Sequence, residues 1–128
     1  KLITMPIPTQ YQTAIPYLIV ENASAFLFFV QNLFDAEITE LHHRDEAKVY
    51  VMHAELKIGN ATIMCANTTE QWTAQPAGIF IYVENADETY HKAIRLGCTS
   101  IMELCDQPYG RTSGVKDMFG NTWWITSV

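Results

Sequence analysis

His53 and Glu55 are the two residues whose types and spacing most directly suggest acid–base chemistry. They stand two positions apart in segment 49–58, where apolar and polar residues alternate, so both point to the more polar face of a predicted strand. An imidazole beside a carboxylate can act as a general base or bind a ligand, because histidine titrates near neutral pH. The alternative is a partly buried histidine held by one hydrogen bond.

Arg111 is the second candidate, and it directly follows Tyr109 and Gly110. An arginine that points into a cavity would anchor a carboxylate, phosphonate or phosphate through two parallel hydrogen bonds. A salt bridge to a neighbouring Asp or Glu is the alternative use of the same side chain.

The remaining His and Cys residues show no arrangement typical of a metal or nucleophile site. His42 and His43 are adjacent, and adjacent strand residues point to opposite faces, so the two do not easily share one metal. Cys65, Cys98 and Cys105 are odd in number, and they lack metal-type spacing and an evident base. They indicate a reducing cytoplasm rather than a disulfide-stabilised protein.

The elements that must position these residues occur twice. Val20-Glu21-Asn22-Ala23 recurs 63 positions later as Val83-Glu84-Asn85-Ala86, and Gly59-Asn60 recurs 61 positions later as Gly120-Asn121. Between these pairs, the ends of two helix-length segments lie 62 positions apart. Matches that stay in register indicate two copies of one module.

Each copy is predicted to contain a strand, a helix and three further strands. In the first copy we expect a strand at 15–20, a helix at 23–34 that Asn22 caps and Asp35 ends, and strands at 37–43, 49–58 and 61–66. In the second copy we expect a strand at 78–83, a helix at 87–96, and strands at 99–104, 111–116 and 122–127. Within 49–58 the alternation predicts one apolar face: Met52, Ala54, Leu56 and Ile58.

This order predicts the α+β class. A helical crossover followed by a meander gives a mixed sheet with the helix on one face. Two such modules can curl their sheets around a shared cavity, which is the natural place for a ligand. We expect an N-terminal extension at 1–13 and one domain at 14–127, with modules 14–66 and 78–127 joined by a polar linker at 67–77.

Composition and charge exclude several functions. The net charge of −6 argues against nucleic acid as a partner and is compatible with a cationic small ligand. No apolar run approaches the roughly 18 residues of a membrane helix, and no secretory signal pattern is visible at the N-terminus. We therefore expect a cytoplasmic protein without a membrane partner.

The two modules, the stretch Tyr109-Gly110-Arg111 and the stretch from Asp117 to Trp123 resemble the vicinal oxygen chelate (VOC) superfamily. This superfamily contains glyoxalase I, the bleomycin-resistance proteins and the extradiol dioxygenases. Within it, the segments around His53-Ala54-Glu55-Leu56 and Ile63-Met64 look like the PhnB-like branch. The resemblance covers about residues 14–127 and implies a homodimer, because family cavities are often completed between subunits. Its fold hosts unrelated activities.

Metal-using members of this family take two ligands from each module, at the start of its first strand and the middle of its last. The repeat places these positions on Ile15, Met64, Gly78 and Trp124. Three of them cannot bind a divalent cation through the side chain, and the thioether of Met64 is unsuited to a hard metal. We expect no metal and no other cofactor, which argues against glyoxalase and dioxygenase chemistry.

Trp124 would then point into the cavity where relatives place a metal ligand, and Tyr17, Phe80 and Tyr82 would face it too. Such a cavity could stack a flat or cationic ligand, or it could be a filled core. The expected ligand-binding set is Tyr17, His53, Phe80, Tyr82, Tyr109, Arg111 and Trp124, and the catalytic candidates are His53 and Glu55.

Three functions are consistent with these residues. The first is metal-free binding of a small aromatic or cationic molecule, as in bleomycin-resistance proteins. The second is an enzyme, either metal-independent with His53, Glu55 and Arg111, or a glyoxalase- or dioxygenase-like enzyme that uses displaced ligands. The third is a non-catalytic interaction protein whose cavity is filled. Acidic charge and inward aromatic residues favour the first.

Overall fold

The computed structural model describes residues 6–128, so the first five residues of the predicted extension lie outside the described part. The first module consists of β1 (Tyr17–Val20), α1 (Ala23–Phe34), β2 (Glu37–His43), β3 (Val51–Ile58) and β4 (Ala61–Asn67). The second consists of β5 (Gly78–Tyr82), α2 (Ala86–Arg95), β6 (Thr99–Gln107), β7 (Gly110–Lys116) and β8 (Thr122–Ser127). The predicted α+β class and the repeated β-α-β-β-β module are confirmed.

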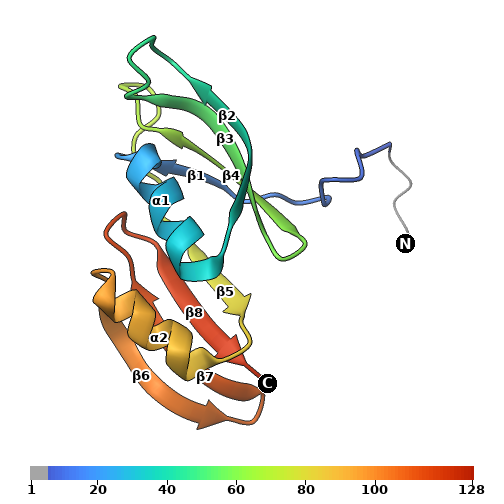
Figure 1. Ribbon diagram of the computed structural model, residues 1–128, viewed down its shortest axis with the longest axis vertical. Helices are drawn as coiled ribbons and strands as arrows, with labels where there is room; N and C mark the ends of the chain where they lie inside the picture. Colours follow the sequence, from blue (N-terminus) through green and yellow to red (C-terminus); the bar gives the residue numbers. More distant parts are fainter. Residues whose placement is uncertain (1–5) are drawn as a thin grey trace.

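Each module forms its own four-stranded mixed sheet, with strand orders β1-β4-β3-β2 and β5-β8-β7-β6. The first and last strands of each module pair in parallel, and the other pairs are antiparallel. A parallel pair needs a crossover, which the helix of each module supplies. α1 and α2 each pack on one face of the sheet in their module (Figure 1). We call the opposite face of each sheet its open face.

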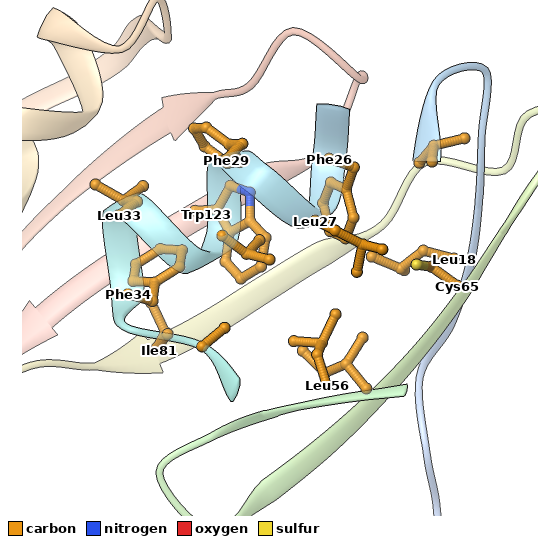
Figure 2. Close-up of a cluster of buried hydrophobic side chains, with 14 of the residues drawn as sticks. Leu18, Phe26, Leu27, Phe29, Leu33, Phe34, Leu56, Cys65, Ile81 and Trp123 are labelled. Carbon is orange, nitrogen blue, oxygen red and sulfur yellow. The ribbon is translucent and has the colours of Figure 1, made fainter. Parts of the chain in front are cut away.

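The helix α1 joins the two modules. It begins where Asn22 Oδ1 accepts a hydrogen bond from Ala25 N at 3.1 Å, and it ends at Asp35, whose φ of 54° is left-handed. Both ends agree with the sequence prediction. The ring of Phe34 lies 4.8 Å from the ring of Trp123, a fully buried residue of β8. Figure 2 shows Trp123 against α1 within the apolar core, so this core holds the two modules together.

The strand β3 departs from the predicted alternation at its start. Ala54 and Leu56 are fully buried, as expected. His42 pairs with His53, whereas His43 pairs with Val51, so Met52 is an extra residue in β3. This bulge reverses the predicted faces, because Val51 is fully buried and Met52 is 54% exposed.

Residues 10–12 of the predicted extension lie against the first sheet of their own chain. The side chain of Gln12 exchanges two hydrogen bonds with the backbone of Thr62. Gln12 Nε2 donates to Thr62 O at 2.8 Å, and Thr62 N donates to Gln12 Oε1 at 3.2 Å. The hydroxyl of Thr62 donates to the carbonyl of Gln10 at 2.8 Å. These bonds bring the side chain of Tyr11, between the two glutamines, to the open face.

Within residues 6–128 no helix is long and apolar enough to cross a membrane. The cytoplasmic location stays a prediction.

Candidate functional site

A chain of three side-chain hydrogen bonds runs across the open face of the first sheet. The hydroxyl of Tyr17 lies 2.9 Å from His53 Nδ1, and His53 Nε2 lies 2.8 Å from Glu55 Oε2. The hydroxyl of Tyr11 donates to Glu55 Oε1 at 2.5 Å. Glu55 is only 6% exposed, so its two partners hold the carboxylate almost out of solvent. The two catalytic candidates, His53 and Glu55, are therefore in contact, with a tyrosine at each end.

Strand register explains why these residues meet. Tyr17 in β1 pairs with Met64 in β4, and Met64 pairs with Glu55 in β3, so the three form a row across one face. His53 stands two positions before Glu55 and shares that face. Leu18, which follows Tyr17, and Ala54, which lies between His53 and Glu55, are buried. They point into the core and so fix the orientation of β1 and β3.

The hydrogen bonds of this chain control its protonation. The hydrogen bond from Tyr11, more than the contact with His53, holds the pKa of Glu55 below its ordinary value, although burial opposes this effect. The bond to Glu55 raises the pKa of Tyr11, and burial raises the pKa of Tyr17. An ionised Glu55 only accepts hydrogen bonds, so Nε2 of His53 carries the proton between them. In the neutral imidazole, Nδ1 then accepts from Tyr17, so a proton can pass from Tyr17 towards His53.

A cavity of about 510 Å³ opens beside Tyr17, and we call it the Tyr17 cavity. Its floor comes from the open face and includes Tyr17, Ile19, Met52 and Ala66. Its rim comes from the linker residues Thr69, Trp72 and Gln75 and from Arg44, which directly follows β2. The cavity therefore combines aromatic and apolar walls with one charged group, and it lies within the first module and the linker.

The other predicted aromatic residues lie on the second sheet. Phe80 and Trp124 are paired across β5 and β8, and the rings of Tyr82 and Tyr109 lie 5.2 and 6.1 Å from the ring of Phe80. Phe80, Tyr82 and Tyr109 are 47%, 65% and 51% exposed, so they form an exposed aromatic surface rather than the walls of the Tyr17 cavity. The expectation that all these aromatic residues share one cavity is not met within this chain.

A separate cavity, of about 380 Å³, does lie between the modules. It is at the C-terminal end of α1, and its lining includes Phe34, Asp35, Gly59, Tyr82 and Glu84. Of the predicted ligand-binding residues, only Tyr82 belongs to it. The residues that the sequence assigned to a shared cavity are thus divided between two sheets.

Arg111 forms a salt bridge with α2, which is the alternative that the sequence left open. Its Nε and Nη2 donate to the two carboxylate oxygens of Asp87 at 3.0 and 3.1 Å, and Nη1 lies 3.4 Å from Asp106. The guanidinium lowers the pKa of Asp87. Alternation in β7 places Arg111 on the face opposite Gly114, which lies against Trp124 on the open face. Arg111 therefore does not face the Tyr17 cavity or the exposed aromatic residues.

The four positions of the family metal site carry no set of donors for a hard cation. Met64 and Trp124 lie on the open faces of different sheets, and Ile15 and Gly78 offer no donor atom in a side chain. In the described residues 6–128, no group of three His, Cys, Asp or Glu side chains is arranged to hold a metal ion. The family metal does not fit these residues.

The remaining candidates stay separate from this site. His42 is exposed and contacts Glu40 at 2.9 Å. Cys65 and Cys98 are buried, and burial raises the pKa of each thiol to about 12, which leaves them protonated at neutral pH. Cys105 is half-buried. Neither a metal nor a nucleophile site is built from these residues.

Sequence reasoning missed three residues of the site. Tyr11 lies in a segment that reads as an extension, and Arg44 lies in a charged turn. Trp72 stands in a polar linker, and it did carry a signal, because a large aromatic residue there has no core to pack into. Only the folded chain brings the three to one face.

Comparison with known proteins identifies the fold and the family. The model of the Glyoxalase/Bleomycin resistance protein/Dioxygenase superfamily matches residues 11–125, which confirms the resemblance seen in the sequence. The uncharacterized proteins Rv0887c of Mycobacterium tuberculosis and Mb0911c of Mycobacterium bovis are each 28% identical over 120 residues. The match covers 84% of this chain and 69% and 78% of the relatives, respectively.

Solved structures show the same architecture. A PhnB protein from Bacillus cereus superposes with a TM-score of 0.75 at 24% identity, over 91% of this chain and 100% of that one. TioX from Micromonospora sp. ML1 gives 0.72 at 20% identity, over 91% and 98%. The fosfomycin resistance protein FosX from Listeria monocytogenes gives 0.66 at 19% identity, over 90% and 91%. At these identities the likeness shows the fold alone.

Proposed function

Since this chain belongs to the Glyoxalase/Bleomycin resistance protein/Dioxygenase superfamily, we propose that it is a metal-free protein that binds a small aromatic molecule. The Tyr17 cavity carries this proposal. A volume of about 510 Å³ suits a molecule of two or three fused or linked rings. Tyr17 and Trp72 are 44% and 56% exposed, so their rings are available for stacking. Sequestration without turnover is the role that the resemblance to bleomycin-resistance proteins implies.

Titration with N-phenyl-1-naphthylamine tests this proposal, because this neutral aromatic probe fluoresces strongly in apolar surroundings. We expect saturable binding of one probe per Tyr17 cavity, weakened about tenfold by Trp72→Ala through the lost aromatic contact. Phe28→Ser is the control, since it removes an exposed aromatic residue of α1 that lines neither cavity. Non-saturable binding, or equal effects of both substitutions, would exclude the cavity and favour a non-catalytic interaction protein.

The hydrogen-bonded chain from Tyr17 to Glu55 favours a second candidate, a metal-independent enzyme. In this function His53 takes a proton through Tyr17 from a group in the Tyr17 cavity, and Glu55 stabilises the imidazolium. Hydrolysis of 4-nitrophenyl acetate in the presence of a chelator provides a first assay. His53→Gln should lower the rate by about a hundredfold if His53, within the hydrogen-bonded chain of side chains, acts as the general base. His42→Gln changes an exposed histidine of the same sheet and is the control. Equal rates for both variants would contradict this function.

The homodimer that the resemblance implies is also a proposal. Phe80, Tyr82 and Tyr109 form an exposed aromatic surface that a second copy would cover, and surfaces of this kind mark interaction sites. Sedimentation analysis should give twice the mass of the 14.6 kDa chain. Tyr82→Ser should shift the protein towards the monomer. A monomeric wild-type protein would contradict the homodimer.

A further inference from the structure

We propose that the Tyr17 cavity selects a flat aromatic molecule that carries an anionic group, such as a carboxylate or sulfonate, and that Arg44 holds the anion. This inference rests on the proposed function, because it names the class of ligand for the same cavity. Arg44 is the one charged residue among those that line this cavity in the described chain. Because Arg44 lies at the rim, the rings of Tyr17 and Trp72 are free to contact the ring system of the ligand.

The guanidinium of Arg44 is fixed without being neutralised. It donates to the backbone carbonyl of Asn67 at 3.0 Å, and to those of Val51 and Thr68 at 3.4 Å each. Its Cζ also lies 5.9 Å from the ring centroid of Tyr50. All four partners are uncharged, and within residues 6–128 the ion pairs found do not include Arg44. A bound anion would therefore meet a positioned cation that has no carboxylate to displace.

Hydrogen bonds also hold the ring of Tyr17 and the backbone of Trp72 in place. The hydroxyl of Tyr17 is hydrogen-bonded to His53, which fixes the ring on the open face. Thr69 and Trp72 exchange two hydrogen bonds of 2.8 Å, from Trp72 N to Thr69 Oγ1 and from Thr69 N to Trp72 O. This turn presents Trp72 from the linker. Because the ring of Tyr17 and the backbone of Trp72 are already positioned, part of the ordering cost of stacking a flat ring is met before binding.

The charge distribution favours an anion here over the cationic ligand that the net charge suggested. In the described chain no Asp or Glu belongs to the lining of the Tyr17 cavity. The cavity at the end of α1 differs, because its lining contains three carboxylates and one lysine, Lys92, so its net charge disfavours an anion. With a net charge of −6, the protein as a whole repels anions, so binding of one would depend on the local field of Arg44.

Two probes with the same ring skeleton test this inference. 8-Anilinonaphthalene-1-sulfonate carries a sulfonate, and N-phenyl-1-naphthylamine lacks it. We expect Arg44→Gln to weaken binding of the sulfonate about five- to tenfold and to change that of the neutral probe less than about twofold. Arg44→Lys keeps the charge and should recover part of the difference. Arg95→Gln removes the same charge from the exposed end of α2 and should leave both probes unaffected.

The outcomes separate this inference from the proposed function. Equal effects of Arg44→Gln on the two probes would overturn the anionic preference and leave aromatic binding intact. Failure of both probes to saturate the wild-type protein would overturn the proposed function as well. If Arg44→Gln does not fold, competition in the wild-type protein decides. Naphthalene-1-sulfonate should displace 8-anilinonaphthalene-1-sulfonate at a concentration at least about fivefold lower than uncharged naphthalene-1-sulfonamide does, and equal concentrations would refute a role for Arg44.

Discussion

The same three positions on the open faces carry different residues in the two modules. In the first module, Tyr17, Met64 and Glu55 form a row across β1, β4 and β3. In the second, Phe80, Trp124 and Gly114 form the corresponding row across β5, β8 and β7. The first row contains a buried carboxylate with two hydrogen-bond partners, and the second row contains no group that titrates. The repeated backbone therefore supports a polar site on one sheet and an aromatic surface on the other.

The residue in the third position explains this difference. Glu55 gathers Tyr11 and His53 into the hydrogen-bonded chain, and that chain orients Tyr17 at its cavity. At Gly114 the ring of Trp124 occupies the space of a side chain, since an added Cβ would lie 2.5 Å from Trp124 Cζ3. One position thus decides whether a strand presents a charge or makes room for an aromatic ring.

Gly114→Ala should have the largest effect on stability. The added methyl group overlaps two ring atoms of Trp124, at 2.5 and 2.8 Å, and lies 3.1 Å from Ile101, so the ring must move. We expect a loss of about 1 to 3 kcal/mol in the free energy of unfolding. Gly78→Ala is the matched control, because its Cβ meets no atom within 4 Å, and it should change stability by less than about 0.5 kcal/mol. Denaturant unfolding that ranks the two variants equally would contradict the role of Gly114.

Glu55→Gln should have the next largest effect, because it disrupts the polar row. An amide accepts hydrogen bonds at its oxygen and donates at its nitrogen, so the bonds from Tyr11 and His53 lose their charged acceptor and one of them must reverse its direction. We expect a loss of about 1 to 2 kcal/mol by chemical denaturation. Glu40→Gln alters a carboxylate that contacts His42 in solvent, and it should cost about 0.5 kcal/mol or less. Similar losses for the two variants would mean that the hydrogen bonds of Glu55 contribute nothing to the free energy of unfolding.

Acidification should remove part of the same stabilisation. The pKa of Glu55 is lowered in the folded protein, so the folded state releases this proton more readily than the unfolded state. The contribution is complete above the ordinary carboxyl pKa, and it is lost as the pH falls through that value towards the lower folded-state pKa. The stability difference between wild type and Glu55→Gln, measured from neutral pH to about pH 3, should therefore shrink below about pH 4. A difference that is constant over this range would contradict the lowered pKa.

Arg111→Met should have the smallest effect on stability. It also distinguishes Arg111, in the second module, from Arg44, in the first. The salt bridge of Arg111 with Asp87 is partly solvent-exposed, with 36% and 49% of the side chains accessible, so its loss should leave the free energy of unfolding nearly unchanged. Because Arg111 faces α2, the affinity for both naphthalene probes should be unchanged, whereas Arg44→Gln weakens the sulfonate. Weaker probe binding by Arg111→Met would place the ligand on the second module instead.

The architecture could be predicted from the order of the residues along the chain. Two in-register repeats predicted two β-α-β-β-β modules, and local chemistry predicted the cap at Asn22 and the left-handed end at Asp35. Alternation within one strand predicted that His53 and Glu55 share a face, since residues two apart must do so in an unbroken strand. These features depend on neighbours in the chain, and that is why a single sequence reveals them.

The surroundings of His53 and Glu55 depend instead on how distant segments pack together. The bulge at Met52 depends on how β2 and β3 align, and one extra residue reverses every side chain beyond it. Tyr11, Arg44 and Trp72 come from an extension, a turn and a linker, and no periodicity relates such segments to a sheet. Arg111 and Trp124 lie on opposite faces of the second sheet because of the register in which β7 pairs with β8. Contacts between distant segments are set by register and by packing around α1, so the fold could be predicted from the sequence while the site could not.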